Sequence, residues 1–134
     1  HEIQTKRIAQ HFGAENDFFK TVAYDAQIID RLKNAQSPSV SEEDNKYELL
    51  KSSLFEHRDL TDFSSDEEAY HQLMLDLIAQ QIVSTKLVIH NSPVKKIFVD
   101  GGFSKNSIYK KSIFITIIKI GTTIFLISIC HTTK

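Results

Sequence analysis

The chain has 134 residues, the size of a single domain. Its 16 Lys and Arg residues against 17 Asp and Glu residues leave a formal net charge of -1, which excludes a general basic attraction to nucleic acid or to an anionic membrane. A single cysteine, Cys130, excludes an intramolecular disulfide framework and a cysteine-based zinc site. The sequence starts at His1 and not at Met, so we expect it to begin inside a longer protein, and its first residues show no signal-peptide pattern.

Apolar residues at helical spacing predict four helices, over residues 2–12, 23–34, 41–54 and 66–90. The second and third helices are separated by a stretch of small polar residues that holds Pro38, which predicts a loop. The amino-terminal two thirds of the chain is therefore expected to be helical.

The helix over residues 66–90 has the strongest signal. Ser65 stands three residues before Glu68, the spacing of a capping box, in which each side chain accepts a hydrogen bond from the other residue's backbone N–H. Acidic residues fill the first turn, where the helix dipole favours anions. At a rise of about 1.5 Å per residue the helix would be about 36 Å long, and the Asn-Ser-Pro at residues 91–93 ends it.

A short apolar run, KKIFVD at residues 95–100, predicts a strand that is buried on both faces. Gly101 and Gly102 follow at once, and Ser104 is a candidate cap for the helix that comes next. Glycines lack a Cβ atom, so a ligand can lie against their backbone, and ligands of open α/β sheets bind beyond the carboxyl ends of strands. Taken alone, a Gly-Gly pair after a strand is more often only a tight turn.

The segment VKKIFVDGGFSKNSIY, residues 94–109, resembles the adenosine-binding stretch in the carboxy-terminal domain of FGGY-type carbohydrate kinases. The long helix before it has the family's place and amphipathic character, and EIQTKRIAQHFG and FFKTVAYDA look like segments of bacterial sugar kinases. The resemblance covers roughly residues 1–109. It implies an α/β fold, namely part of a ribonuclease H-like (actin-like ATPase) carboxy-terminal domain, mostly helical here with a short strand before the Gly-Gly turn.

The same resemblance implies a nucleotide site at Gly101, Gly102 and Asn106. In such kinases the second glycine of the pair lies against the nucleotide, which here is Gly102 with Gly101 beside it. The asparagine four residues later commonly hydrogen-bonds the adenine, a task that suits an amide because it donates and accepts at once. The resemblance also implies ATP and Mg²⁺ as cofactors of the intact enzyme and a sugar or polyol as its substrate. Asp100 is expected to cap the turn.

The chain departs from the family in what it lacks. The amino-terminal half of such a kinase holds most of the sugar pocket, the phosphate loops and the catalytic aspartate, and no acidic residue here matches that aspartate. We therefore expect no catalytic residue, weak or no kinase activity alone, a missing amino-terminal kinase half as partner, and a cytoplasmic location. Two other functions stay open: a non-catalytic helical interaction module and a tail-anchored membrane protein.

Residues 110–134 differ in composition from residues 1–109 and are predicted to be a separate segment. Ile, Thr and Phe dominate there, and these residues favour strands. One interpretation is a tail translated after loss of the reading frame. A second is a hairpin that turns near Gly121, with strands IFITIIKI and TTIFLISI. A third is a membrane helix over Ile113–Ile129, at the short end of the usual range of about 17–25 residues.

The remaining polar residues give weaker signals. Ser104 and Lys105 are predicted to be turn and surface residues, and His11 and His71 to lie on helix surfaces or half-buried flanks. None of the six histidines has metal-binding spacing, and helix starts explain the acidic runs, so no metal ligand is predicted. Cys130 lacks a positioned base and is not expected to be a nucleophile.

Overall fold

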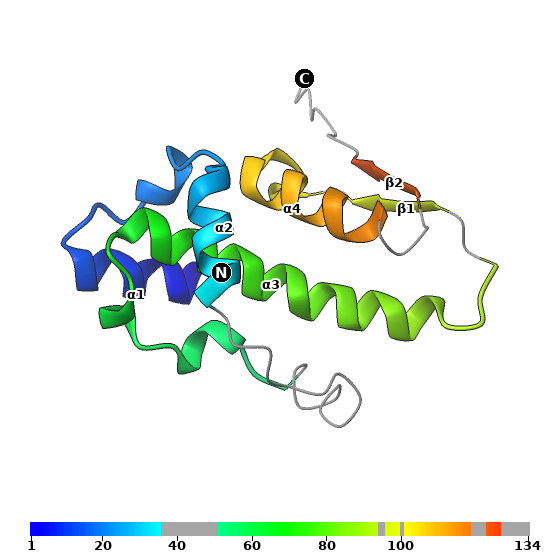
Figure 1. Cartoon of the computed structure of the whole chain (residues 1–134), viewed down its shortest axis with the longest axis horizontal. Helices are drawn as coiled ribbons and strands as arrows, with labels where there is room; N and C mark the ends of the chain where they lie inside the picture. The colour runs from blue at the N-terminus through cyan, green and yellow to red at the C-terminus, as the bar shows by residue number, and fades with distance from the viewer. Residues whose placement is uncertain (36–50, 94–95, 100, 119–122, 127–134) are drawn as a thin grey trace, which may run out of the picture.

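A computed structural model describes residues 1–35, 51–93, 96–99, 101–118 and 123–126. Most of these residues are helical, and the long helix α3 runs through the centre of the arrangement (Figure 1). Short 3-10 helices carry the label η. In chain order the elements are α1 (Glu2–Phe12), η1 (Phe18–Lys20), α2 (Ala26–Ala35), η3 (Leu54–His57), η4 (Leu60–Asp62), α3 (Asp66–Ile89), β1 (Lys96–Val99), η5 (Gly102–Lys105), α4 (Ser107–Ile118) and β2 (Thr123–Leu126).

The helix predicted over residues 66–90 is present as α3 and ends one residue earlier. Oγ of Ser65 accepts a hydrogen bond from the N–H of Glu68 at 3.1 Å, as the capping spacing predicts. The second bond of the predicted capping box, from the Ser65 N–H to the Glu68 side chain, is replaced. The Glu68 carboxylate instead accepts from the hydroxyl and the N–H of Ser64, at 2.6 and 2.7 Å. These two bonds hold the pKa of Glu68 below its ordinary value. The start of α3 is therefore fixed by local side chains.

The first two helices also lie close to their predicted positions. The helix predicted over residues 2–12 is α1, and the one predicted over 23–34 is α2, which begins only at residue 26. Oδ1 of Asp25 accepts two N–H groups in the first turn of α2, at 2.8 and 3.3 Å, and so caps it. The helix predicted over 41–54 falls mostly outside the described residues, and the chain from Leu54 forms η3 instead.

The hydrophobic core lies between α3 and the helices around it. Figure 1 shows α1 and α2 beside the amino-terminal half of α3 and α4 further along it, and residues of all three contact α3. Much of α3 is buried on every side, which is typical of a helix at the centre of a domain. The buried members of the core are Ile8, Ile29, Phe55, Leu60, Ala69, Tyr70, Leu73, Met74, Ile78, Ile82, Ile108, Tyr109 and Ile113.

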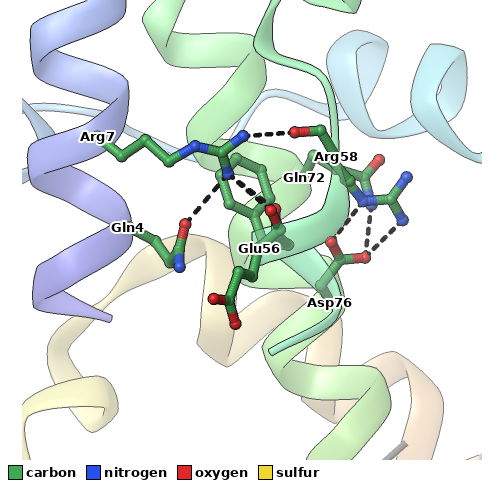
Figure 2. A network of polar contacts seen from close by, with 7 residues as sticks. Gln4, Arg7, Glu56, Arg58, Gln72 and Asp76 are labelled. Carbon is green, nitrogen blue, oxygen red and sulfur yellow. Dashed lines mark hydrogen bonds and ion pairs between the residues drawn. The ribbon is translucent and has the colours of Figure 1, made fainter. Parts of the chain in front are cut away.

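A group of polar side chains joins α1, the segment after η3, and α3 (Figure 2). Arg7 donates to the backbone carbonyls of Phe55 at 3.1 Å and of Arg58 at 2.6 Å. The Arg58 guanidinium donates twice to Asp76, at 2.6 and 2.7 Å, and this bond raises the pKa of Arg58. Gln72 donates to the same carboxylate at 2.9 Å. We call Arg7, Arg58, Gln72 and Asp76 the arginine network; it fixes an irregular segment against two helices.

The fold class implied by the resemblance is wrong. The described strands have four residues each and form one parallel pair, in which Lys96 faces Thr123 and Val99 faces Leu126. No further strand extends this pair within the described residues. An α/β ribonuclease H-like domain is built on a sheet that helices cover on both faces. Here the helices pack around α3 instead, so the described chain is mostly helical and that α/β fold is not shown.

The first part of the isoleucine-rich tail is also helical, contrary to its strand-favouring composition. Ile108, Tyr109 and Ile113 of α4 are buried, with exposed fractions of 0, 2 and 2%. Their burial, with contacts between α4 and α3, outweighs the strand propensity of the segment. The predicted hairpin is wrong for the described residues, because its first strand falls in α4 and β2 pairs in parallel with β1.

The other predictions for the tail concern a membrane helix, the boundary of the segment, Cys130 and the reading frame. None of the helices in the described part of the chain combines the length and the apolar character needed to cross a membrane. The predicted boundary between residues 109 and 110 falls inside α4. Cys130 lies outside the described residues. The lost reading frame stays a prediction.

Candidate functional site

A cavity of about 420 Å³ opens between η1, α3 and η5. Its volume is within the range of about 300–1,000 Å³ that is typical of small-molecule sites. Four separate parts of the sequence form its walls. The lining residues are His1, Phe19, Lys20, Tyr70, Gly102, Phe103, Lys105 and Asn106.

The two glycines after β1 have different structural roles. Gly101 has φ +94°, a conformation that residues with a side chain rarely adopt, so the turn itself requires this glycine. Gly102 has no such φ, and a Cβ atom built on it would meet nothing within 4 Å. Gly102 lines the cavity, whereas Gly101 is not among the lining residues. The backbone conformation therefore does not explain why position 102 is a glycine. The close approach of a ligand to the backbone would explain it. Asp100 lies outside the described residues.

Asn106 links the cavity to the start of α4. Its Oδ1 accepts the N–H of Tyr109 at 2.9 Å, which is the bond of a helix cap. The predicted cap, Ser104, is instead buried (4% exposed) and donates its hydroxyl to the carbonyl of Gly101 at 2.7 Å, so its predicted surface position is wrong too. Nδ2 of Asn106 donates to the hydroxyl of Tyr70 at 2.9 Å. An amide has two N–H groups and two acceptor lone pairs, so one of each is left for a ligand.

Aromatic rings form one wall of the cavity. The ring of His1 packs edge-to-face against three others, with centroid distances of 5.1 Å to Phe19, 5.4 Å to Phe103 and 5.8 Å to Tyr70. Such contacts hold aromatic rings in defined orientations. The wall can therefore present ring faces and edges to a flat, apolar ligand group.

Tyr70 is the polar centre of this wall. Its side chain is fully buried, and burial raises its pKa to about 12, so the hydroxyl stays protonated at neutral pH. The hydroxyl accepts from Asn106, and it lies 3.1 Å from Nε2 of His1, to which it can donate. We call His1, Tyr70 and Asn106 the pocket cluster. It holds together three parts of the chain that are far apart in the sequence.

Two lysines give the rim of the cavity a positive charge. Lys20 ends η1, and its Nζ lies 3.5 Å from Oδ2 of Asp17, with about two thirds of both side chains exposed. Such an exposed pair contributes little to stability. Lys105 ends η5 and is exposed, as the sequence predicts. None of the lining residues that the structure describes is acidic, so the rim favours an anionic ligand group.

Sequence reasoning identified Gly102 and Asn106 but missed the aromatic wall. The available signals were Phe103, directly after Gly102, and the pair Phe18-Phe19 directly before Lys20, within a stretch already noted for its resemblance to sugar kinases. Tyr70 gave no signal of its own, because it lies in a helix with many apolar residues.

His71 was also misplaced, because it is fully buried and not at a helix surface or flank. Its Nε2 accepts the N–H of Asp25 at 3.1 Å, so the proton lies on Nδ1, which donates to the carbonyl of Glu67 at 2.8 Å. The N–H of Tyr24 donates to the hydroxyl of Ser107 at 3.0 Å. These bonds fasten the chain between η1 and α2 to α3 and α4, and thus support the cavity wall that η1 contributes.

The Mg²⁺ implied by the resemblance does not fit the residues of this site. Mg²⁺ prefers oxygen ligands, above all carboxylates and phosphates. The lining residues within the described part of the chain carry two ammonium groups and no carboxylate. Across the described ranges, no three His, Cys, Asp or Glu side chains come together as a metal site would need.

The comparisons with known proteins give no independent support for a family. No family model matches the chain, and no curated protein or solved structure does so either. The resemblance to FGGY-type kinases therefore depends on the residues that carry it, chiefly 94–109.

Proposed function

We propose that this chain supplies the adenosine-binding part of an ATP-dependent kinase that acts on a sugar or polyol hydroxyl. The observation that carries the proposal is the glycine at position 102. It lines the same cavity as Asn106 and the aromatic wall, and neither its φ nor any neighbouring atom requires a glycine there. A ligand that lies against the backbone would require a glycine at this position.

The lining residues match the parts of adenosine. An adenine ring can stack on the aromatic wall, and stacking of a base on an aromatic side chain is worth about 1–3 kcal/mol. The free N–H and lone pair of Asn106 can pair with the edge of the base, which has both donors and acceptors. The lysines at the rim are suited to phosphates.

Phosphoryl transfer needs groups that we do not assign to any residue of this chain. Transfer to a hydroxyl requires a base for its proton and several charges around the phosphates. No residue here is assigned as that base, so an amino-terminal kinase half would have to contribute it, together with the sugar pocket. We place the assembled enzyme in the cytoplasm. We expect weak or no ATP consumption by the chain alone across a panel of sugars and polyols.

Calorimetric titration with adenosine tests the site, with Gly102→Ala as the critical variant. The added methyl group should weaken adenosine binding by at least about ten-fold, the smallest effect expected when a methyl-sized group changes the fit of a pocket. The melting temperature of the Gly102→Ala variant should stay unchanged or rise slightly, because the backbone at Gly102 accepts a side chain.

Gly101→Ala is the matched control for this experiment. It should lower the stability, by about 1–3 kcal/mol, because φ is +94° and ψ is -165° there, a region that almost only glycine adopts. The proposal would be contradicted if the wild-type chain binds neither adenosine nor ATP, or if Gly102→Ala binds adenosine as tightly as the wild type does.

The alternative function, a non-catalytic interaction module, has one observation in its favour. Apolar side chains are exposed at the end of α3 and on α4, including Val88 at 79% and Phe114 at 47%. Large exposed apolar groups are typical of surfaces that contact other proteins. A silent titration with adenosine and ATP would favour this function over the nucleotide site.

A further inference from the structure

We infer that this site takes the phosphates of its nucleotide as a metal-free anion, with Lys20 and Lys105 as the counter-charges, so that Mg²⁺ weakens binding. The inference rests on the proposed function, because it assumes that the cavity holds adenosine. It differs from the expectation for the intact enzyme, in which Mg²⁺ accompanies ATP.

The two lysines reach the cavity from separate elements. Lys20 comes from η1 and Lys105 from η5, and both line the same cavity as the aromatic wall. A nucleotide whose base lies against the rings would extend its phosphates toward a rim that carries two positive charges. Attraction between opposite charges near a surface strengthens as the ligand becomes more anionic.

Asp17 is the one described carboxylate shown to pair with either lysine. Its 3.5 Å contact with Lys20 is exposed to water, so a phosphate can replace it at little energetic cost. While the pair persists, Asp17 reduces the positive charge at the rim. Removing this carboxylate should therefore strengthen the binding of an anion.

Magnesium changes the charge that the lysines meet. A bound Mg²⁺ ion neutralises two negative charges of a polyphosphate and is the largest local charge at its site. Among the described residues that line the cavity, none offers a carboxylate to hold the ion in return, so the complex loses attraction to the lysines and gains no protein ligand from them. The affinity for ATP should therefore fall when Mg²⁺ is added.

Calorimetric titration of the whole chain with adenosine, AMP and ATP, each in EDTA and in excess Mg²⁺, tests this inference. In EDTA the affinity should rise from adenosine to AMP to ATP. Mg²⁺ should weaken ATP binding by about five-fold, the scale of one charge pair in water, and leave adenosine binding unchanged. Added salt should weaken ATP binding in the same direction.

Three variants locate the charges. Lys20→Met and Lys105→Met should each weaken ATP binding by about five-fold and leave adenosine binding unchanged, whereas Asp17→Asn should strengthen ATP binding. Tighter ATP binding in Mg²⁺, or wild-type affinity in both lysine variants, would overturn the inference. If adenosine binds and ATP binds no more tightly, only this inference fails. If neither ligand binds, the proposed function fails as well.

Discussion

The two polar clusters that meet α3 differ in how far their hydrogen-bonding groups are already used. In the arginine network, the buried carboxylate of Asp76 accepts two bonds from Arg58 and one from Gln72 (Figure 2). In the pocket cluster, Asn106 still has one N–H group and one lone pair beside a cavity. At 3.6 residues per turn, Gln72 lies about 200° around the helix from Tyr70, so the clusters occupy different sides of it.

Because of this difference, we expect the arginine network to contribute to stability and the pocket cluster to contribute to ligand binding. A charged network with its groups paired inside the protein holds segments together and offers little to a ligand. A cluster with unused groups at a cavity can exchange bonds with a ligand. Changes in the arginine network should therefore alter the free energy of unfolding without altering affinity, and the site-facing groups of the pocket cluster should matter for affinity.

The largest expected effect comes from breaking the arginine network. Asp76→Ala leaves the Arg58 guanidinium without its carboxylate and should lower the free energy of unfolding by about 3 kcal/mol, as measured by urea denaturation. The affinity of the folded protein for adenosine should not change. Glu15→Ala, at an exposed position, is the control and should stay within about 0.5 kcal/mol of the wild type. A loss of adenosine binding by folded Asp76→Ala would remove the distinction between the clusters.

The dependence of stability on alkaline pH tests the burial of Tyr70 in the pocket cluster. Its pKa is raised to about 12, and a tyrosine in the unfolded chain ionises near pH ~10, so the folded protein holds this proton more tightly. Stability should be complete below pH ~10 and fall by about 2 kcal/mol as the pH rises towards 12, less than the full shift because the hydroxyl lies beside an open cavity. Burial also raises the pKa of Tyr109, which adds to the loss in the same direction.

Urea denaturation between pH 9 and 12 measures this loss. Tyr70→Phe should make the stability less dependent on pH over that range, and Tyr24→Phe, which leaves Tyr70 in place, should not. An unchanged pH dependence in Tyr70→Phe would contradict the assignment.

The smallest expected effect separates the two roles of Asn106. Asn106→Ala removes the cap of α4 and should lower the free energy of unfolding by about 1 kcal/mol, whereas Asn106→Ser keeps a capping oxygen and should retain most of the stability. Both variants lack the amide and should bind adenosine more weakly. If Asn106→Ser binds adenosine as the wild type does, the asparagine serves only as a cap.

Local signals explain which parts of the fold could be predicted from the sequence. The start of α3 was predictable because Ser65 and Glu68 lie close together in the chain, and the cap forms between them. The sequence predicted that a helix begins after the Gly-Gly turn, but the composition of Ile, Thr and Phe did not predict that α4 continues to Ile118. Its formation depends on a cap from Asn106 and on burial of residues such as Ile108 against a helix far away in the sequence.

The same distinction holds for the site. The Gly-Gly turn and Asn106 lie within six consecutive residues, so a local motif indicated them. The aromatic wall is assembled from His1, Phe19, Tyr70 and Phe103. Only Phe103 lies within that motif, and only the tertiary structure brings the other three rings to it. The sheet expected around the turn was wrong because the core is built on a helix, and no local pattern shows which element occupies the centre of a fold.

The bond between the Tyr109 N–H and Asn106 gives the molecule a built-in reporter. That amide proton can exchange with solvent only when the cap opens, because the Tyr109 nitrogen donates it to Oδ1 of Asn106 across an N–O distance of 2.9 Å. A ligand that fixes the same side chain would keep the first turn of α4 closed for longer. Hydrogen exchange at this single backbone position would therefore follow occupancy of the cavity without any label on the ligand.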